Sequence, residues 1–362
     1  MDNTTGYSYQ FQNFGKTSNR GIELSVNVDV INKGDFRFNV GAIYNYNRNK
    51  LDELPNADQY LYSSYWGSSS LVPTNDYMFV EGKAIGLVRG FISEGYYTVD
   101  DFNYTNGQYV LKEGVPDITK ALTATYMHPY DLPAGQTAFP GAAKFRDVDE
   151  SGTVDLDDAT CLGEVMPRHT GSFQLNFNYK NFDLSTNFNW TAGGKVYNVA
   201  AMINASGQEF DGIGAQRASW VADAFKVYNV NAAGDLYAVT NPDELRALNA
   251  NAKYHLPYHQ SGITSSEWLE NGSYLRLQTL TLGYTLPKNW LTKVHVDKIR
   301  LYLTATNLFT ITGYSGIDPE VNANPTGQSG FYSDLRIFPT LNMDFGTYPR
   351  ARTFTFGANI TF

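Results

Sequence analysis

Residues 22–30 are Ile22-Glu23-Leu24-Ser25-Val26-Asn27-Val28-Asp29-Val30, with an aliphatic side chain at every second position. After Lys33-Gly34-Asp35 the alternation resumes at Phe36 and continues to Tyr46. A period of two places successive side chains on opposite faces of a β-strand. The composition of the break between the two runs is typical of a tight turn. The stretch therefore predicts a long hairpin with one apolar and one polar face.

The same alternation recurs along the chain and predicts an all-β fold. It occupies residues 173–179, 182–190, 280–286, 299–305 and 353–362. Weaker candidates lie at residues 7–14, 86–97 and 143–146. Together they predict about eight to ten antiparallel strands of roughly ten residues each.

The connections between these strands differ greatly in length. Short turns at 33–35 and 180–181 alternate with long connections near 50–80, 191–271 and 314–348. Short periplasmic turns and long extracellular loops are typical of a transmembrane β-barrel. Within the longest connection, Pro242-Asp243-Glu244 predicts the first turn of a short helix.

A soluble β-sandwich also alternates and is the competing interpretation. Two observations favour the barrel. The strands are longer than the usual five or six residues, and their polar faces carry Asn, Thr, Ser and Gln instead of the Lys and Glu of a solvated surface. A neutral face of amides and hydroxyls suits a water-filled lumen.

The composition narrows the class of protein further. The chain has 362 residues, 15% of them aromatic and 17% charged, and a net charge of -9. The acidic balance argues against a nucleic-acid partner, and no run of 18 apolar residues could form a transmembrane helix. The single Cys161 cannot form an internal disulfide.

The first residues lack the features of a secretory signal, so we expect either an intracellular chain or a piece of a longer exported one. Enzyme signatures are absent, and we expect no catalytic activity.

Several stretches resemble the C-terminal barrel region of SusC-like (RagA-like) TonB-dependent outer-membrane transporters of Bacteroidetes. They occur in the order of that family and span almost the whole chain. The stretches are Asn13-Phe14-Gly15-Lys16, Asn19-Arg20-Gly21-Ile22-Glu23-Leu24, Phe145-Arg146-Asp147-Val148-Asp149-Glu150-Ser151-Gly152, Trp268-Leu269-Glu270-Asn271-Gly272-Ser273-Tyr274-Leu275-Arg276-Leu277, Thr281-Leu282-Gly283-Tyr284-Thr285-Leu286-Pro287, Asn307-Leu308-Phe309-Thr310-Ile311-Thr312-Gly313-Tyr314-Ser315-Gly316, Asp318-Pro319-Glu320-Val321 and Tyr348-Pro349-Arg350-Ala351-Arg352-Thr353-Phe354.

The resemblance implies that residues 1–362 are part of a 22-stranded barrel that imports glycan fragments or peptides across the outer membrane. It implies a SusD-like surface lipoprotein as the extracellular partner and the TonB complex as the energy source. The signal peptide, the TonB box and the plug domain of that family have no counterpart in these residues. We therefore expect that this chain alone does not transport.

The last strand resembles the terminal aromatic strand that the barrel-assembly machinery recognises in outer-membrane proteins. Its apolar face carries Phe354, Phe356, Ile360 and Phe362. A barrel must pair its last strand with its first. The resemblance implies that these residues act as the assembly signal.

An acidic loop predicts a calcium site. Residues at loop positions 1, 3, 5, 7, 9 and 12 match the oxygen-ligand spacing that a hard cation requires, with Gly152 at position 6. These positions are Asp147, Asp149, Ser151, Thr153, Asp155 and Asp158. Asp158 replaces the usual Glu, so a dockerin-like half-loop is the closer analogy. The alternative is an acidic turn held by its own hydrogen bonds.

Aromatic residues in the first long connection are candidates for stacking on sugar rings. They are Tyr60, Tyr62, Tyr65 and Trp66. Packing of the loop against its neighbours is the more frequent use of such residues. His255 and His259 have the spacing of helical metal ligands, but Pro257 breaks the helix that would align them.

Two classes of function remain open. The first is the barrel portion of a nutrient importer. The second is a soluble or surface-bound, calcium-dependent β-protein that binds carbohydrate.

Overall fold

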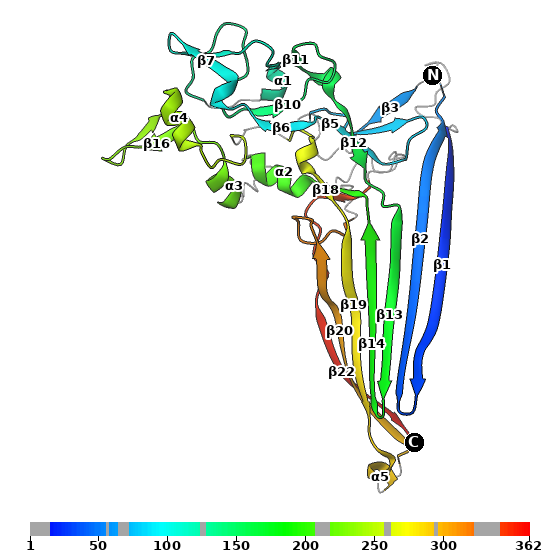
Figure 1. Cartoon of the computed structure of the whole chain (residues 1–362). Coiled ribbons are helices and arrows are strands. Elements are labelled where there is room, and N and C mark those ends of the chain that lie inside the picture. Colours follow the sequence, from blue (N-terminus) through cyan, green and yellow to red (C-terminus); the bar gives the residue numbers. More distant parts are fainter. Residues whose placement is uncertain are drawn as a thin grey trace, which may run out of the picture.

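One open antiparallel sheet and a cap of short elements at one end of it make up the structure (Figure 1). The computed structural model describes residues 15–55, 58–63, 72–123, 128–206, 218–256, 262–292, 296–321 and 341–362. Seven long strands run side by side in the order β1, β2, β13, β14, β19, β20, β22. Their bounds are Lys16–Lys33, Phe36–Glu53, His169–Tyr179, Phe182–Ala192, Tyr274–Thr285, Lys298–Thr312 and Thr353–Thr361. β1 and β22 are the two edges of this sheet.

The register of the sheet confirms the predicted separation of two faces. Directly opposed residues share a face, and one apolar row crosses all seven strands through Ile31, Phe38, Phe177, Leu184, Leu282, Leu303 and Phe356. The next row is polar throughout and consists of Asp29, Asn39, Asn176, Ser185, Thr281, Thr304 and Thr355. We call these two sides the apolar face and the polar face. A bulge at Val30 shifts the alternation in β1 by one residue, so that Ile31 returns to the apolar face.

Aromatic rings mark both ends of the apolar face. Near the short turns, one row joins Phe36, Tyr179, Phe182 and Tyr284 across four strands. Near the cap, the face carries Tyr44, Tyr46, His169 and Trp190. The hydroxyl of Tyr44 is 2.8 Å from Nδ1 of His169. The apolar side chains of the sheet thus lie between two aromatic rows.

The hydrophobic core lies in the cap and at its junction with the sheet. One cluster centres on Phe91, Tyr97 and Phe139, and a second joins Leu51 of β2 to Tyr77, Tyr197 and other cap residues. Among the described residues, no such cluster covers the apolar face between its aromatic ends, where Val26 is 55% and Phe356 is 74% exposed. No part of the chain that the structure describes therefore packs as a second layer over the apolar face.

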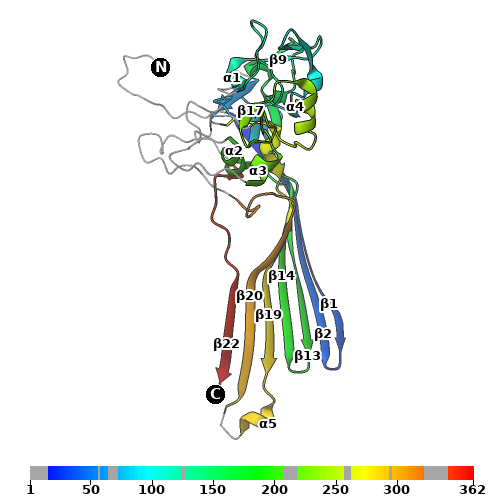
Figure 2. The same ribbon diagram turned by 90° about the vertical axis from the view of Figure 1, so that its left-hand side faces the viewer.

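Three long connections build the cap (Figures 1 and 2). Their strands are β3 Gln59–Tyr62, β4 Tyr77–Val80, β5 Leu87–Gly90, β6 Ser93–Tyr96, β7 Phe102–Thr105, β8 Gln108–Leu111, β9 Asp117–Ile118, β10 Ala143–Phe145, β11 Thr153–Val154, β12 Thr160–Glu164, β15 Lys195–Asn198, β16 Tyr228–Val230, β17 Leu236–Ala238, β18 Leu269–Asn271 and β21 Met343–Asp344. Their helices are α1 Lys120–Thr123, α2 Val199–Ser206, α3 Ala218–Asp223, α4 Pro242–Leu248, η3 Val99–Asp101, η4 Leu156–Asp158 and η5 Ser266–Trp268. At the opposite end of the sheet, α5 Lys288–Leu291 lies between β19 and β20.

The first long connection is much longer than the stretch near 50–80 that was predicted from the sequence. Residues 54–168 separate the neighbouring strands β2 and β13. The candidates at 86–97 and 143–146 were wrong as long strands of the main sheet, because they form the short cap strands β5, β6 and β10. Alternation over only four residues suits a short strand in a packed cap equally well. The candidate at 7–14 lies outside the described residues, and the expected count of eight to ten long strands is not confirmed.

The other predicted features of the connections are confirmed. Long connections follow β14 and β20, and the short turns lie at Gly34 and between Tyr179 and Phe182. The predicted loop helix is α4, where Oδ1 of Asn241 accepts hydrogen bonds from the amides of Asp243 and Glu244. Within the described residues, no helix is long and apolar enough to cross a membrane.

An ion pair spans three strands of the polar face across a glycine. Nε of Arg300 in β20 donates to Oδ1 of Asp183 in β14 at 2.9 Å. Gly283 of β19 lies between them, and a Cβ atom there would lie 2.5 Å from the Arg300 guanidinium and from both Asp183 oxygens. The glycine therefore gives the two charged side chains the space to meet.

We predict that Gly283→Ala lowers the stability of the sheet by about 0.5–3 kcal/mol, because the added methyl group must displace the ion pair. The temperature at which the folded band is lost on heating in gel migration would measure this effect. Gly313→Ala is the control, since nothing lies within 4 Å of a Cβ atom at that position. Equal losses in both variants would show that the ion pair does not depend on Gly283.

Candidate functional site

The polar face of the sheet is a continuous surface of amides and hydroxyls. Hydrogen bonds link side chains across it: Asn39 donates to Asn27 and to Asp29, Ser185 donates to Asn176, and the hydroxyls of Thr281 and Thr304 lie 2.9 Å apart. The amides and hydroxyls can both donate and accept hydrogen bonds without carrying charge. A few charged side chains, such as Asp29 and the Asp183–Arg300 pair, lie among them. Such a face can contact water and polar solutes along the whole length of the strands.

A buried arginine fixes the chain segment after β20 to the cap end of this face. Arg276 of β19 is 2% exposed. Its Nη1 donates to Oε2 of Glu320 at 2.9 Å, its Nη2 to Oδ1 of Asp318 at 2.5 Å and its Nε to the Thr310 hydroxyl at 3.0 Å. Nη2 of Arg350 lies 2.6 Å from Oε1 of Glu320. Three sequence stretches that carried the resemblance, around 276, 318–320 and 350, therefore meet in one ion cluster.

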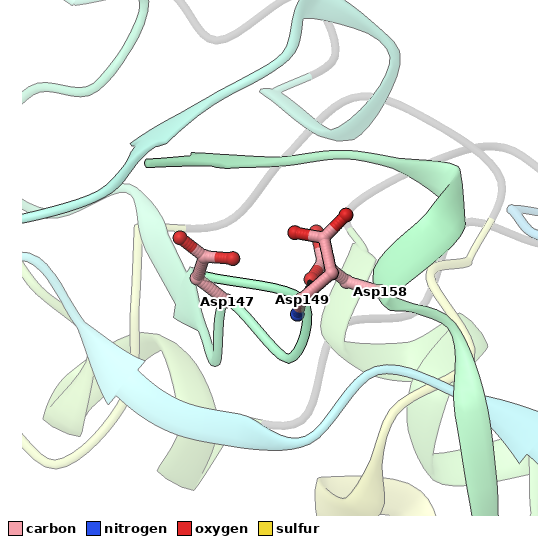
Figure 3. A group of neighbouring side chains, drawn as sticks. All are labelled: Asp147, Asp149 and Asp158. Atoms are coloured by element: carbon pink, nitrogen blue, oxygen red, sulfur yellow. Dashed lines mark hydrogen bonds between the residues drawn. The ribbon is translucent and has the colours of Figure 1, made fainter. Parts of the chain in front are cut away.

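Three of the six predicted calcium ligands converge in the acidic loop (Figure 3). Carboxylate oxygens of Asp147, Asp149 and Asp158 lie within 4.8 Å of one another. Asp158 comes from η4 and is fully buried, and its Oδ2 accepts a hydrogen bond from the amide of Asp155 at 2.8 Å. Gly152 has a φ of 87°, as the tight turn between the first ligands requires.

The other predicted ligands stabilise the loop itself. Oδ1 of Asp155 accepts from the amide of Asp157 and caps η4. The Ser151 hydroxyl donates to the backbone carbonyl of Thr153 at 3.0 Å. Hydrogen bonds from the side chain and backbone of Ser151 lower the pKa of Asp149 below its ordinary value. The loop thus combines the predicted cluster of carboxylates with the hydrogen bonds of the alternative interpretation.

The predicted sugar-stacking residues have different environments. Tyr62 is only 5% exposed, and its ring packs on those of Tyr77 and Phe79 in the cap core. Its ring faces are used for packing, so the structure does not favour sugar contact there. Tyr60 is 37% exposed and keeps its predicted role as a hypothesis. Tyr65 and Trp66 lie outside the described residues.

The cap contains an aromatic pocket that was not predicted from the sequence. A cavity of about 200 Å³ is lined by Trp220, Tyr254, Trp268 and Glu267, with Asn204 and other residues at its border. The rings of Trp220 and Tyr254 stack at 3.8 Å between centroids, and Trp268 lies 5.3 Å from Trp220. The residues come from α2, α3, η5 and the chain after α4, and no spacing in the sequence links these segments.

Two titratable groups lie at this pocket, the buried His255 and the half-buried Glu267. Burial raises the pKa of Glu267 to about 7 and lowers the pKa of His255 to about 4. Nε2 of His255 is 3.7 Å from Oε2 of Glu267, and Nδ1 of His255 donates to the Leu256 carbonyl at 2.8 Å. His259, its predicted i+4 neighbour, lies outside the described residues.

Comparisons with known proteins confirm the resemblance drawn from the sequence. No protein-family model matches the chain. A TonB-dependent receptor of Formosa agariphila is 29% identical over 359 residues, covering 99% of this chain and 30% of that receptor. The TonB-dependent receptor SusC of Bacteroides thetaiotaomicron is 24% identical over 360 residues, covering 97% of this chain and 27% of SusC. The chain thus spans about a third of the length of the curated relatives it matches.

Solved structures show the same fold. A structure of the RagAB peptide transporter superposes with a TM-score of 0.62 at 19% identity, covering 98% of this chain and 30% of that chain. The RagAB peptide importer in its 'open-open' state gives a TM-score of 0.58 at 20% identity with the same coverage. At these identities, the likeness describes the arrangement of the chain and not its ligand.

We predict a pH-dependent stability difference between the wild type and Glu267→Gln. The raised pKa of Glu267 means that wild-type stability falls as pH rises from about 4.5 to about 7, because the unfolded carboxyl ionises first. Gln cannot ionise, so the variant gains up to about 3 kcal/mol relative to wild type between pH 5 and pH 8. Thermal unfolding at a series of pH values, followed by tryptophan fluorescence, measures this difference. The exposed Glu113→Gln is the control, and a constant difference for Glu267→Gln across this range would contradict the prediction.

Proposed function

We propose that this chain is part of the barrel of an outer-membrane, TonB-dependent nutrient importer of the SusC-like kind. The names of its relatives support transport and not catalysis. The polar face would line the lumen through which the substrate passes, and the apolar face would contact lipid. Oligosaccharides or peptides are the proposed substrates, in keeping with the peptide named for RagAB.

The exposed apolar face carries this proposal. From Phe36 to Tyr46, β2 advances ten residues, or about 34 Å, along the strand. At the strand tilt of about 40° found in outer-membrane barrels this corresponds to about 26 Å, close to their apolar band of roughly 25 Å. The aromatic rows lie at both limits of this length, where such barrels have aromatic girdles.

The alternative function, a soluble or surface-bound carbohydrate-binding module, fits the sheet less well. A soluble sheet covers its apolar face with a second layer. Here the clusters of buried residues formed by the described part of the chain lie in the cap or at its junction with the sheet. Most of the large apolar side chains between the aromatic rows remain exposed or half-buried. Lipid is the environment that suits such a surface.

The partners we propose follow from the same resemblance. A SusD-like lipoprotein would contact the cap, which lies at the extracellular end if the short turns are periplasmic. The TonB complex would act through parts of the receptor other than these residues. The open edges β1 and β22 support the need for further strands, since an unpaired strand edge is not tolerated in lipid.

We also propose that the acidic loop 147–158 binds Ca²⁺. The convergence of Asp147, Asp149 and Asp158 supports this, because Ca²⁺ requires six or more oxygen ligands and carboxylates supply the strongest of them. The ion would order the loop between β10 and β12 and perform no chemistry.

The import proposal is tested in the full-length receptor with Cys161→Ser, since Cys161 is exposed. We expect that a membrane-impermeant maleimide labels Asn176→Cys on the polar face and slows uptake, whereas the adjacent Phe177→Cys on the apolar face is not labelled. Growth on a panel of oligosaccharides and peptides identifies the substrate, because a strain without the receptor should fail on at least one of them. Growth of this strain on every member, or labelling of the two cysteines in the reverse order, would refute the proposal.

Calcium binding is tested by titration calorimetry of the purified receptor. We expect a dissociation constant of about 0.1–1 mM, as in extracellular calcium modules, and its loss in Asp158→Asn but not in Asp235→Asn, which changes an exposed cap residue. Because Asp158 is buried and the Asp158→Asn variant can misfold, the binding heat of the wild-type receptor decides whether the site exists. An absence of calcium heat in the wild type at millimolar concentration would rule the site out.

A further inference from the structure

A cluster of basic side chains occupies the cap end of β1 and β2. Arg20 lies directly opposite Arg48 in the register of the two strands, and Ser18 lies opposite Lys50. The register runs without a break from these pairs to Ile22 opposite Tyr46 and Leu24 opposite Tyr44. The basic side chains therefore continue the apolar face, one row beyond its aromatic limit.

This side of the two strands points away from the interior of the cap. The alternate residues Asn49 and Leu51 are buried on the other side. There Oδ1 of Asn49 accepts from the amide of Ile85 at 2.6 Å, and Leu51 belongs to a core cluster of the cap. Because neighbouring residues of a strand point in opposite directions, Arg48 and Lys50 face outward.

The charges of this cluster are not balanced by the residues that the structure describes. Like charges placed directly opposite each other in a sheet are destabilising, yet neither Arg20 nor Arg48 forms an ion pair with any described residue. The carboxylate of Asp52 lies 3.4 Å from Nζ of Lys50. Three cations and one anion leave two positive charges around a hollow of about 280 Å³, lined by Ser18, Arg20, Arg48, Lys50 and Asp52.

We propose that this hollow binds the phosphate-bearing head group of a lipid in the outer surface of the membrane. The inference rests on the proposed function, which places the apolar face in lipid. One guanidinium group can bind two phosphate oxygens through parallel N–H···O bonds, and the guanidinium groups of Arg20 and Arg48, which are opposed in the register, both line this hollow. Aromatic girdles mark the boundary between acyl chains and head groups. Arg20 and Arg48 lie one row beyond the aromatic residues, at the level of the membrane where head groups are found.

The surface below the cluster favours a lipid over a free phosphate ion. Ile22, Leu24 and Val26 follow Arg20 on the same side of β1, and all three are more than half exposed. They offer an apolar track for acyl chains directly below the proposed phosphate site. A free anion would use the arginines alone.

The test uses the purified full-length receptor, stripped of lipid and titrated with lipid A, a phosphorylated glycolipid, in detergent while native mass spectrometry counts bound lipid. We expect Arg20→Gln/Arg48→Gln to bind lipid A about 30-fold more weakly, since each basic residue near an anionic surface contributes a factor of about five. Dephosphorylated lipid A should bind the wild type as weakly as lipid A binds the variant. Millimolar inorganic phosphate should not displace lipid A.

The charge-matched control is Arg37→Gln/Lys298→Gln, which changes two exposed basic residues on the polar face near the short turns. It should bind lipid A as the wild type does. Equal affinity of the wild type and Arg20→Gln/Arg48→Gln, both folded by heat-modifiable migration, would overturn this inference alone. Displacement of lipid A by inorganic phosphate would show that the hollow binds a free anion, and it would overturn the assignment of a lipid. Failure of the folded wild type to insert into vesicles would overturn the proposed function together with this inference.

Discussion

The structure depends on one constraint, the strict alternation of side chains held in register across seven antiparallel strands. A shift of one residue in any strand would move its apolar side chains to the polar face. The bulge at Val30 shows how the chain preserves the rule, since the extra residue is absorbed and Ile31 returns to the apolar row. Both candidate surfaces, the one for lipid and the one for solute, follow from this separation.

The alternation could be read from the sequence because it is local. The hairpin of Val28 and Val40, the helix that begins at Pro242 and the short turns all follow from residues close together in the chain. The faces of the individual strands were therefore predicted correctly. The register between strands far apart in the sequence, such as Phe38 opposite Phe177, needed the structure.

The cap was poorly predicted because its contacts are distant in sequence and its strands are short. Glu267 lines the same cavity as Trp220 and Tyr254, and no periodicity connects them. Tyr62 could not be assigned to the core without knowing that Tyr77 and Phe79 pack on it. Arg276 was noticed only as part of a resembling stretch, whereas the structure shows that it binds two acids more than forty residues away. The convergence of Asp147, Asp149 and Asp158 was the exception, because these three residues lie within twelve positions of the sequence.

The shared core of the cap has a mechanical consequence. One cluster unites Leu54 and Tyr77 from the first long connection, Tyr197 and Trp268 from the second, and Met343 from the third. None of the three connections can swing aside as a separate lid without pulling its side chains out of this cluster. Leu51 in the same cluster belongs to β2, so the cluster also anchors the cap to the main sheet. If this end of the molecule opens, the three connections would thus move together as one block relative to the long strands. The hinge would lie where the long strands enter the cap.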